Sequence, residues 1–152
     1  MNTKVVSMAE LAELAGTDLG YSPWFQIDQK RIDVFADATD DDQWIHVDPE
    51  RAKSGPFGQP IAHGYLTLAM VVPMWITVLD VRDARTKVNY GLNKVRFPAP
   101  VPVGSRVRLG VTLRDAEDIR GPGVQLTLDT VVEVEGSDKP ACVAQLIFRY
   151  YS

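Results

Sequence analysis

The longest apolar run in the chain, residues 65–79, limits the possible folds more than any other feature. Coiled into a helix, the run would be apolar on nearly every side, so the helix must be buried on most of its surface. A helix that crosses a bilayer needs about 20 apolar residues, whereas this run is shorter and includes Thr67 and Thr77. We therefore expect a buried central helix and no membrane span.

A proline inside this run predicts an interruption of the helix. Pro73 has no backbone N–H, and a proline ring collides with the carbonyl one turn earlier, which costs about 3 kcal/mol or more in a regular helix. We expect a bend or a break between Ala69 and Pro73.

The second half of the chain alternates apolar and polar residues, with the two-residue period of β-strands. The expected strands are residues 88–97, 105–113, 124–135 and 141–151. Glycine, proline and aspartate separate them, so an antiparallel meander is the simplest topology. Together these elements predict an α+β fold, in which an antiparallel sheet wraps around a long central helix within a single domain of residues 1–152.

Shorter elements precede the central helix. We expect helices over residues 7–15, 28–38 and 49–54, a strand over residues 24–27, and loops over residues 17–23 and 38–48. Asp28 and Asp48 are good N-cap residues for the second and third helices, because a carboxylate accepts hydrogen bonds from the free N–H groups of a first turn.

Charge and cysteine content restrict the partners and the compartment. The net charge is -4, and lysine and arginine are scattered singly, whereas nucleic-acid binding needs a concentrated basic face. The one cysteine, Cys142, excludes an internal disulfide and suits a reducing compartment. The first residues lack the apolar segment of a signal peptide, so we expect a cytoplasmic protein that binds no nucleic acid.

The predicted sheet has open edges, and these also point to a partner. Long edge strands without dense charge leave backbone N–H and carbonyl groups free to pair with another chain. We therefore expect a homodimer formed by edge pairing.

Residues 38–48 concentrate four carboxylates and one of the two histidines of the chain. In one irregular loop, Asp41 and His46 could both reach a single water, the carboxylate as proton acceptor and the imidazole as a second partner or proton donor. Such a pair suits the addition or removal of water. The aspartates could equally be turn and cap formers, and chemistry alone does not choose among Asp40, Asp41 and Asp42.

A second stretch, residues 59–64, leads into the central helix and holds the other histidine. At the start of that helix the Gly64 N–H has no intrahelical partner, and glycine allows a ligand oxygen to approach closely. Gly64 is therefore a candidate oxyanion donor, although it could simply begin the helix. Beside a proline-rich loop, His63 fits a hydrogen-bonded structural residue better than a second base.

Metal ions and phosphate groups fit the sequence less well. His46 and His63 with nearby aspartates could supply metal ligands, but the usual ligand spacing is absent, and we predict no metal and no cofactor. Lys94 and Arg96 share one face of their expected strand. They could contact the phosphates of a nucleotide-bearing substrate or form a solvated face.

Three segments, residues 35–49, 57–64 and 95–104, together resemble the MaoC-like hot-dog hydratases, the (R)-specific enoyl-CoA hydratases. The resemblance extends from about residue 27 to the C-terminus. It implies a hot-dog fold, a homodimer with the active site near its interface, an acyl-CoA thioester as substrate, and no cofactor.

The same resemblance assigns roles to individual residues. It identifies Asp41 and His46 as the catalytic pair and the Gly64 N–H as the donor to the thioester carbonyl. It implies (R)-specific syn hydration of a trans-2-enoyl thioester, in which water adds at C3 and a proton is returned to C2.

The chain departs from the family at Gln43 and Trp44, where the family often has asparagine and proline. Glutamine can donate and accept as asparagine does, one methylene further out, and Trp44 could line the site or only pack. The candidates for substrate binding are five residues: Gln43, Trp44, His63, Lys94 and Arg96.

Two other interpretations stay open beside the enoyl-CoA hydratase. One is dehydration of 3-hydroxyacyl chains on acyl carrier protein, which is the same chemistry on a different carrier. The other is a non-catalytic acyl-CoA-binding hot-dog subunit, in which Asp41 and His46 are structural. A hot-dog thioesterase fits less well, because it directs water at the carbonyl rather than at C3.

Overall fold

Three long antiparallel strands form the centre of the sheet. A computed structural model describes residues 2–152, and in it β6 (Arg106–Ile119), β7 (Gly123–Val134) and β8 (Cys142–Tyr151) follow one another as a meander. Over most of their length, buried residues alternate with more accessible ones, as expected of strands with one covered face. These strands confirm the predicted β-rich second half.

Strand β5 (Thr86–Arg96) occupies a different place from the one that a simple meander predicts. It pairs with β8 rather than with β6, so the order of the sheet is β2, β6, β7, β8, β5. Strand β2 (Thr17–Tyr21) forms the opposite edge, and the short β3 (Phe25–Gln26) also pairs with β6, which confirms the strand expected near residue 25. The expected meander is therefore correct for β6 to β8 and wrong for β5.

The segment between β5 and β6 accounts for this difference. Three prolines within residues 97–105 remove N–H donors that a hairpin would use. The segment is instead held against the loop before the central helix. The Ala62 N–H donates to the Val101 carbonyl (2.8 Å), and the Val103 N–H donates to the Pro60 carbonyl (2.9 Å). Two consecutive strands are thus kept apart.

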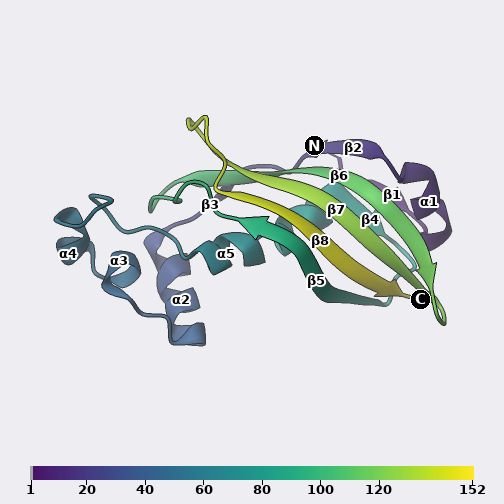
Figure 1. Cartoon of the computed structure of the whole chain (residues 1–152), viewed down its shortest axis with the longest axis horizontal. Helices are drawn as coiled ribbons and strands as arrows, with labels where there is room; N and C mark the ends of the chain where they lie inside the picture. Colours follow the sequence, from purple (N-terminus) through teal and green to yellow (C-terminus); the bar gives the residue numbers. More distant parts are fainter. Residues whose placement is uncertain (1) are drawn as a thin grey trace.

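The sheet curves over the central helix, which consists of two parts (Figure 1). Helix α5 (Gly64–Ala69) and helix α6 (Val71–Val78) are separated at Met70. The separation confirms the predicted break, because Pro73 has no N–H to donate to the Ala69 carbonyl four residues earlier.

The core lies between α6 and the inner face of the sheet. Trp75 on α6 belongs to the same buried core cluster as Leu109 and Leu126, which are fully buried on β6 and β7. The Trp75 Nε1–H donates to the Tyr150 hydroxyl on β8 (2.8 Å), so the polar atoms of both rings are paired inside the core. This packing confirms the α+β fold with a sheet wrapped around a helix. Within residues 2–152, the helices are all too short or too polar to cross a membrane.

The N-terminal helix expected over residues 7–15 is confirmed, and it begins with a capping box. It consists of η1 (Met8–Glu10) and α1 (Leu11–Leu14), and the Ser7 side chain accepts from the Glu10 N–H while the Glu10 carboxylate accepts from the Ser7 N–H. These reciprocal bonds satisfy two donors that a helix start leaves free.

Other N-terminal elements were not predicted. Residues 17–21 form β2 rather than a loop, because they pair with β6 although aspartate and glycine are poor strand formers. Two short strands, β1 (Lys4–Val6) and β4 (Leu79–Val81), form a separate parallel pair. Pairing between distant segments decides both cases, and local composition does not reveal it.

Three short helices gather at one end of the molecule, beyond the long strands (Figure 1). They are α2 (Gln29–Thr39), α3 (Trp44–Val47) and α4 (Pro49–Lys53). The Asp28 and Asp48 side chains cap α2 and α4 as predicted. Helix α3 lies within the stretch that was expected to be an irregular loop, so that expectation is wrong; a single turn is too short to show a helical period.

Candidate active site

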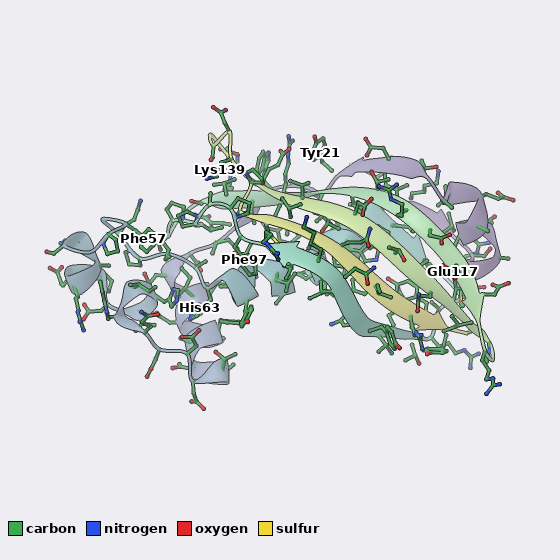
Figure 2. The ribbon with its side chains drawn as sticks, in the orientation of Figure 1. Tyr21, Phe57, His63, Phe97, Glu117 and Lys139 are labelled. Atoms are coloured by element: carbon green, nitrogen blue, oxygen red, sulfur yellow. The ribbon has the colours of Figure 1, made fainter. Side chains whose placement is uncertain are left out.

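Six residues from three separate segments line one pocket of about 330 Å³: Asp41, His46, His63, Gly64, Tyr65 and Phe97. The pocket lies where the α2–α4 end of the molecule meets the start of α5 and the end of β5. Figure 2 shows His63 and Phe97 in this region. The three residues predicted to be catalytic thus lie around one cavity.

Asp41 reaches the pocket through the turn that ends α2. Asp40, the C-cap residue of α2, has φ 59 in the left-handed region, which aspartate tolerates better than most residues other than glycine. Asp41 follows it with an exposed side chain, and its carbonyl lies 2.7 Å from the His63 Nε2.

The surroundings of His46 decide which of its ring nitrogens carries hydrogen. Its Nδ1 lies 2.6 Å from the Ile61 carbonyl oxygen. A carbonyl only accepts, so Nδ1 is the N–H donor and the neutral ring keeps a lone pair at Nε2. Burial lowers the pKa of His46 below its ordinary value of 6.5, and the hydrogen bond to Ile61 opposes this only in part. His46 is therefore suited to accept a proton near neutral pH.

His63 packs directly against His46. The two rings stack with centroids 3.8 Å apart and planes 22° from parallel. The centroid of the Phe35 ring lies 4.8 Å from the centroid of the His63 ring. His63 is 2% exposed. Its Nε2 donates to Asp41, and its Nδ1 is buried with no hydrogen-bond partner in residues 2–152. The expectation of a hydrogen-bonded histidine agrees with these contacts.

Gly64 begins α5 directly beneath an aromatic ring. A Cβ atom at this position would lie 3.1 Å from the Phe97 ring, closer than side chains normally approach. As the first residue of a helix, Gly64 has an N–H without an intrahelical partner. Phe97 and the pocket therefore both favour glycine here.

The candidates Gln43 and Trp44 lie beside the pocket and not among the residues that line it. Gln43 is the N-cap residue of α3, and its carbonyl accepts from the His46 N–H (3.0 Å). The Trp44 ring packs on Gly55, where a Cβ would lie 2.7 Å from the ring, and the Arg51 guanidinium lies 4.5 Å from the ring centroid. Trp44 thus joins α3 to the end of α4.

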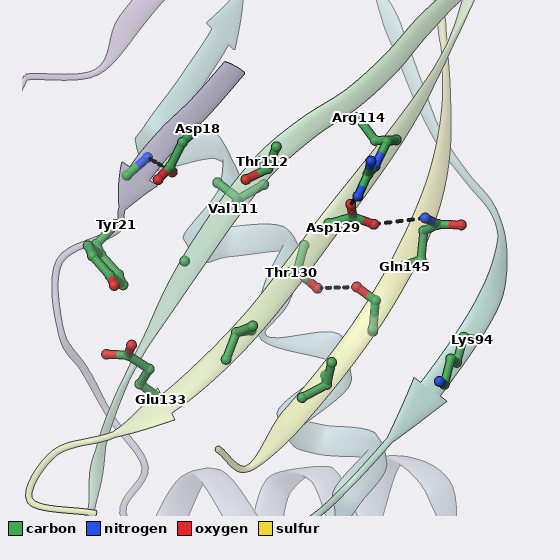
Figure 3. Close-up of a pocket in the computed structure, with 15 residues that line it drawn as sticks. Asp18, Tyr21, Lys94, Val111, Thr112, Arg114, Asp129, Thr130, Glu133 and Gln145 are labelled. Carbon is green, nitrogen blue, oxygen red and sulfur yellow. Dashed lines mark hydrogen bonds and ion pairs between the residues drawn. The ribbon is translucent and has the colours of Figure 1, made fainter. Parts of the chain in front are cut away.

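The candidates Lys94 and Arg96 also lie outside the residues that line this pocket. Lys94 lines a hollow of about 570 Å³ on the outer face of the sheet, beside the hydrogen-bonded Asp129 and Gln145 (Figure 3). The Arg96 Nη1 donates to the Val95 carbonyl (2.7 Å).

Sequence reasoning missed several residues of the site. One wall of the pocket is formed by the rings of Phe97 and Tyr65. Their centroids lie 6.3 Å apart in an edge-to-face arrangement. The Gln29 Nε2 donates to the His46 carbonyl (2.8 Å) and to the Asp33 carboxylate (2.9 Å). Position alone hinted at Tyr65, which follows Gly64; Gln29 and Phe97 are brought to the site only by the tertiary fold.

Asp41, His46 and His63 place one potential ligand atom each within 4.8 Å of one another, as a metal site requires. However, Nδ1 of His46 and Nε2 of His63 already donate to carbonyls. Each remaining lone pair lies in the plane of its own ring, and the two ring planes are stacked 22° from parallel. Both could not point at one ion, so this donor set fits a metal poorly.

Comparison with known proteins identifies the family. The MaoC like domain matches residues 10–135. The 3-hydroxyacyl-thioester dehydratase Z of Mycobacterium tuberculosis (strain ATCC 25618 / H37Rv) is 56% identical over 144 residues, which cover 95% of each chain. The nodulation protein N of Rhizobium meliloti (strain 1021) is 42% identical and covers 93% of this chain and 89% of its own length.

Solved structures agree with the expected hot-dog fold. A monoamine oxidase regulatory protein from Archaeoglobus has a TM-score of 0.79 at 21% identity and covers 100% of this chain and 99% of its own. The (R)-hydratase from A. caviae has a TM-score of 0.68 at 21% identity and covers 88% of this chain and 94% of its own. On the strength of the domain match and of the 56% identical relative, the chain belongs to the MaoC-like domain family.

Proposed function

We propose that this chain is a hydro-lyase that interconverts trans-2-enoyl-CoA and (R)-3-hydroxyacyl-CoA. One observation carries the proposal. A ring nitrogen of His46 and a carboxylate oxygen of Asp41 lie within 4.8 Å of each other at the pocket, a separation that one water bridges with two hydrogen bonds of about 2.8 Å. The name of the 56% identical relative, a 3-hydroxyacyl-thioester dehydratase, supports the same reaction class.

In the hydration direction, the water lies between the Asp41 carboxylate and the bare Nε2 of His46. As the water oxygen bonds to C3, the Asp41–His46 pair takes up its proton and the C2=C3 electron pair moves toward the thioester oxygen. The Gly64 N–H donates to that oxygen. The pair then returns a proton to C2, which restores the carbonyl. Because both additions come from one side, the addition is syn.

Typical magnitudes indicate how much Asp41, His46 and Gly64 would each contribute to the rate. General acid–base assistance by a positioned side chain is typically worth about 10² to 10⁴. Loss of one oxyanion donor costs about 2.7 to 4 kcal/mol. The lowered pKa of His46 keeps its ring neutral at pH 7, as a proton acceptor requires.

The direct test follows the enoyl absorbance of crotonyl-CoA and of longer trans-2-enoyl-CoAs. We expect turnover by the wild type and a loss of about 10² to 10⁴ in kcat for Asp41→Asn and for His46→Gln. Asp42→Asn is the matched control, because it removes an adjacent exposed carboxylate that does not line the pocket. Normal turnover by either site variant would refute the mechanism.

The carrier is decided in the same assay. Acyl carrier protein presents the same thioester as CoA, so we compare both carriers with one acyl chain. A much higher kcat/KM for the carrier protein would make the chain a 3-hydroxyacyl-ACP dehydratase. Tight acyl-CoA binding without turnover would make it a non-catalytic binding subunit.

We also propose that the enzyme is a homodimer paired through β5, with the site near the interface. The outer edge of β5 has no partner strand in residues 2–152. Val88, Tyr90 and Leu92 on this strand are 40%, 55% and 42% exposed, and an exposed apolar edge strand favours pairing. A cytoplasmic location stays a prediction that the single cysteine supports.

A further inference from the structure

His63 lies at the junction of the three groups to which the proposed function assigns the chemistry. It precedes Gly64 in the chain, stacks on His46, and donates from Nε2 to the Asp41 carbonyl. It is 2% exposed, and both ring nitrogens are withdrawn from solvent. A ring in this position is poorly placed to exchange protons with a substrate and well placed to hold its neighbours.

The loop that carries Asp41 has few other attachments. Asp40, Asp41 and Asp42 are all exposed. Within residues 2–152, the bond from His63 is the one hydrogen bond that joins these three residues to another secondary-structure element. That bond reaches across 22 residues of sequence. It fixes the Asp41 backbone relative to the start of α5, and hence relative to the Gly64 N–H.

The stack of the two imidazole rings also links His63 to His46, the third of these groups. With centroids 3.8 Å apart, the rings of His63 and His46 are in van der Waals contact, and the Phe35 ring also contacts His63. The Ile61 carbonyl holds His46 from the other direction at 2.6 Å. The orientation of the His46 ring is therefore defined by one hydrogen bond and one stacked face.

We propose that His63 is a positioning residue, which holds Asp41 through its Nε2–H and His46 through its ring, and so fixes both relative to Gly64. This inference rests on the proposed roles of Asp41 and His46. It adds a role for a residue that was expected only to be structural or to contact the substrate. Misplacement of a reacting group by about 1 Å can cost about 10² in rate, so loss of this contact should be visible in kcat.

Three variants separate the hydrogen bond from the bulk of the ring. In His63→Gln, the amide nitrogen stands as many bonds from Cα as the histidine Nε2, so the donor to Asp41 is retained. In His63→Asn the amide is one methylene shorter and cannot reach the same carbonyl. In His63→Phe the stacked ring is retained and the donor is lost.

The experiment measures kcat and KM with a substrate that the wild type converts. We expect His63→Asn and His63→Phe to lose about 10² in kcat with little change in KM, and His63→Gln, which keeps the donor to Asp41 but not the ring stacked on His46, to lose clearly less. Equal activity of the Gln and Asn variants, or an effect on KM alone, would overturn the proposal. If His63→Asn does not fold, the comparison of His63→Phe with His63→Gln decides the same question.

Amide hydrogen exchange gives a second reading that does not depend on turnover. We expect faster exchange over residues 40–46 in the Asn and Phe variants than in the wild type and the Gln variant. Unchanged exchange in the Phe variant would contradict the proposed hold on Asp41. If the wild type converts no thioester, the proposed function fails, and this comparison still decides whether His63 positions the loop.

Discussion

The imidazole rings of His46 and His63 stack face to face, with centroids 3.8 Å apart and planes 22° from parallel. Each ring donates one N–H to a backbone carbonyl, His46 to Ile61 and His63 to Asp41. Positive charge on both rings at this distance would be unfavourable, since like charges repel more strongly where water is excluded. The stack therefore favours a neutral His46.

The first prediction concerns the pH dependence of the reaction. Burial lowers the pKa of His46 below 6.5; the Ile61 carbonyl and the Asp41 carboxylate raise it, and the neighbouring His63 lowers it. If His46 is the base, kcat/KM in the hydration direction should fall only at pH values below 6.5, where its ring takes up a proton. The pH–rate profile of the wild type measures this acid limb.

Asp42→Asn is the control for this profile and should leave the acid limb in place. The lowered pKa of His46 also affects the stability of the fold. Because the folded-state pKa is lowered, the contribution of His46 to stability is present above pH 6.5 and is lost as the pH falls through the lowered pKa. An acid limb centred above pH 6.5 would contradict the assignment of His46 as the base.

The second prediction concerns Gly64 and Phe97. In Gly64→Ala, the new Cβ would lie 3.1 Å from the Phe97 ring, so the ring or the start of α5 must shift. Overpacking of this kind costs about 1 to 3 kcal/mol, and the displaced Gly64 N–H should lower kcat. Denaturant unfolding and the enoyl assay measure the two effects.

The double variant Gly64→Ala with Phe97→Ala tests the cause. Alanine lacks the Cγ, Cδ2 and Cε2 atoms of Phe97 that the new Cβ meets, so part of the stability and activity lost in Gly64→Ala should return relative to Phe97→Ala alone. If Phe97→Ala brings no such recovery, contact with the ring is not the reason for glycine at this position.

Local signals in the sequence were enough to predict much of the fold. The alternation of residues 124–135 predicted β7, and Pro73 predicted the break at Met70. Asp28 predicted the start of α2. In each case the determining interaction lies within a few residues of the signal.

The missed features depend on distant contacts. The pairing of β5 with β8, the stack of His63 on His46 and the contact of Phe97 with Gly64 join segments that are far apart in sequence. No local pattern encodes which segments meet. Asp41 was separated from its neighbouring aspartates by family resemblance, and the structure adds the hydrogen bond from His63 to its carbonyl.

The third prediction concerns Trp44, where the chain departs from the family. A Cβ at Gly55 would lie 2.7 Å from Cζ3 and 2.8 Å from Cη2 of Trp44, which are indole atoms that phenylalanine lacks. Gly55→Ala should therefore cost about 1 to 3 kcal/mol in the wild type and less in a Trp44→Phe background. A double-mutant cycle of unfolding free energies measures the coupling, and strictly additive effects would contradict this packing.

The fourth prediction concerns Gln29, whose Nε2 donates to the His46 carbonyl and the Asp33 carboxylate. Gln29→Glu replaces that donor by an oxygen facing two acceptors. It should cost about 1 to 3 kcal/mol of stability and lower kcat by displacing α3. The same change at the exposed Gln26 should alter stability by less than about 0.5 kcal/mol; equal effects at the two sites would argue against a role for Gln29.

The last prediction tests the dimer through β5. Leu92 is 42% exposed on this edge strand, and Leu92→Asp would place a charge among its apolar side chains, as charged edges do in strands that resist pairing. We expect the wild type to be a dimer by light scattering after size-exclusion chromatography and Leu92→Asp to be a monomer with reduced turnover, because the site lies near the proposed interface. Val5→Asp is the matched control, since Val5 is 54% exposed on β1, outside the main sheet. A monomeric wild type, or an unchanged mass for Leu92→Asp, would exclude pairing through β5.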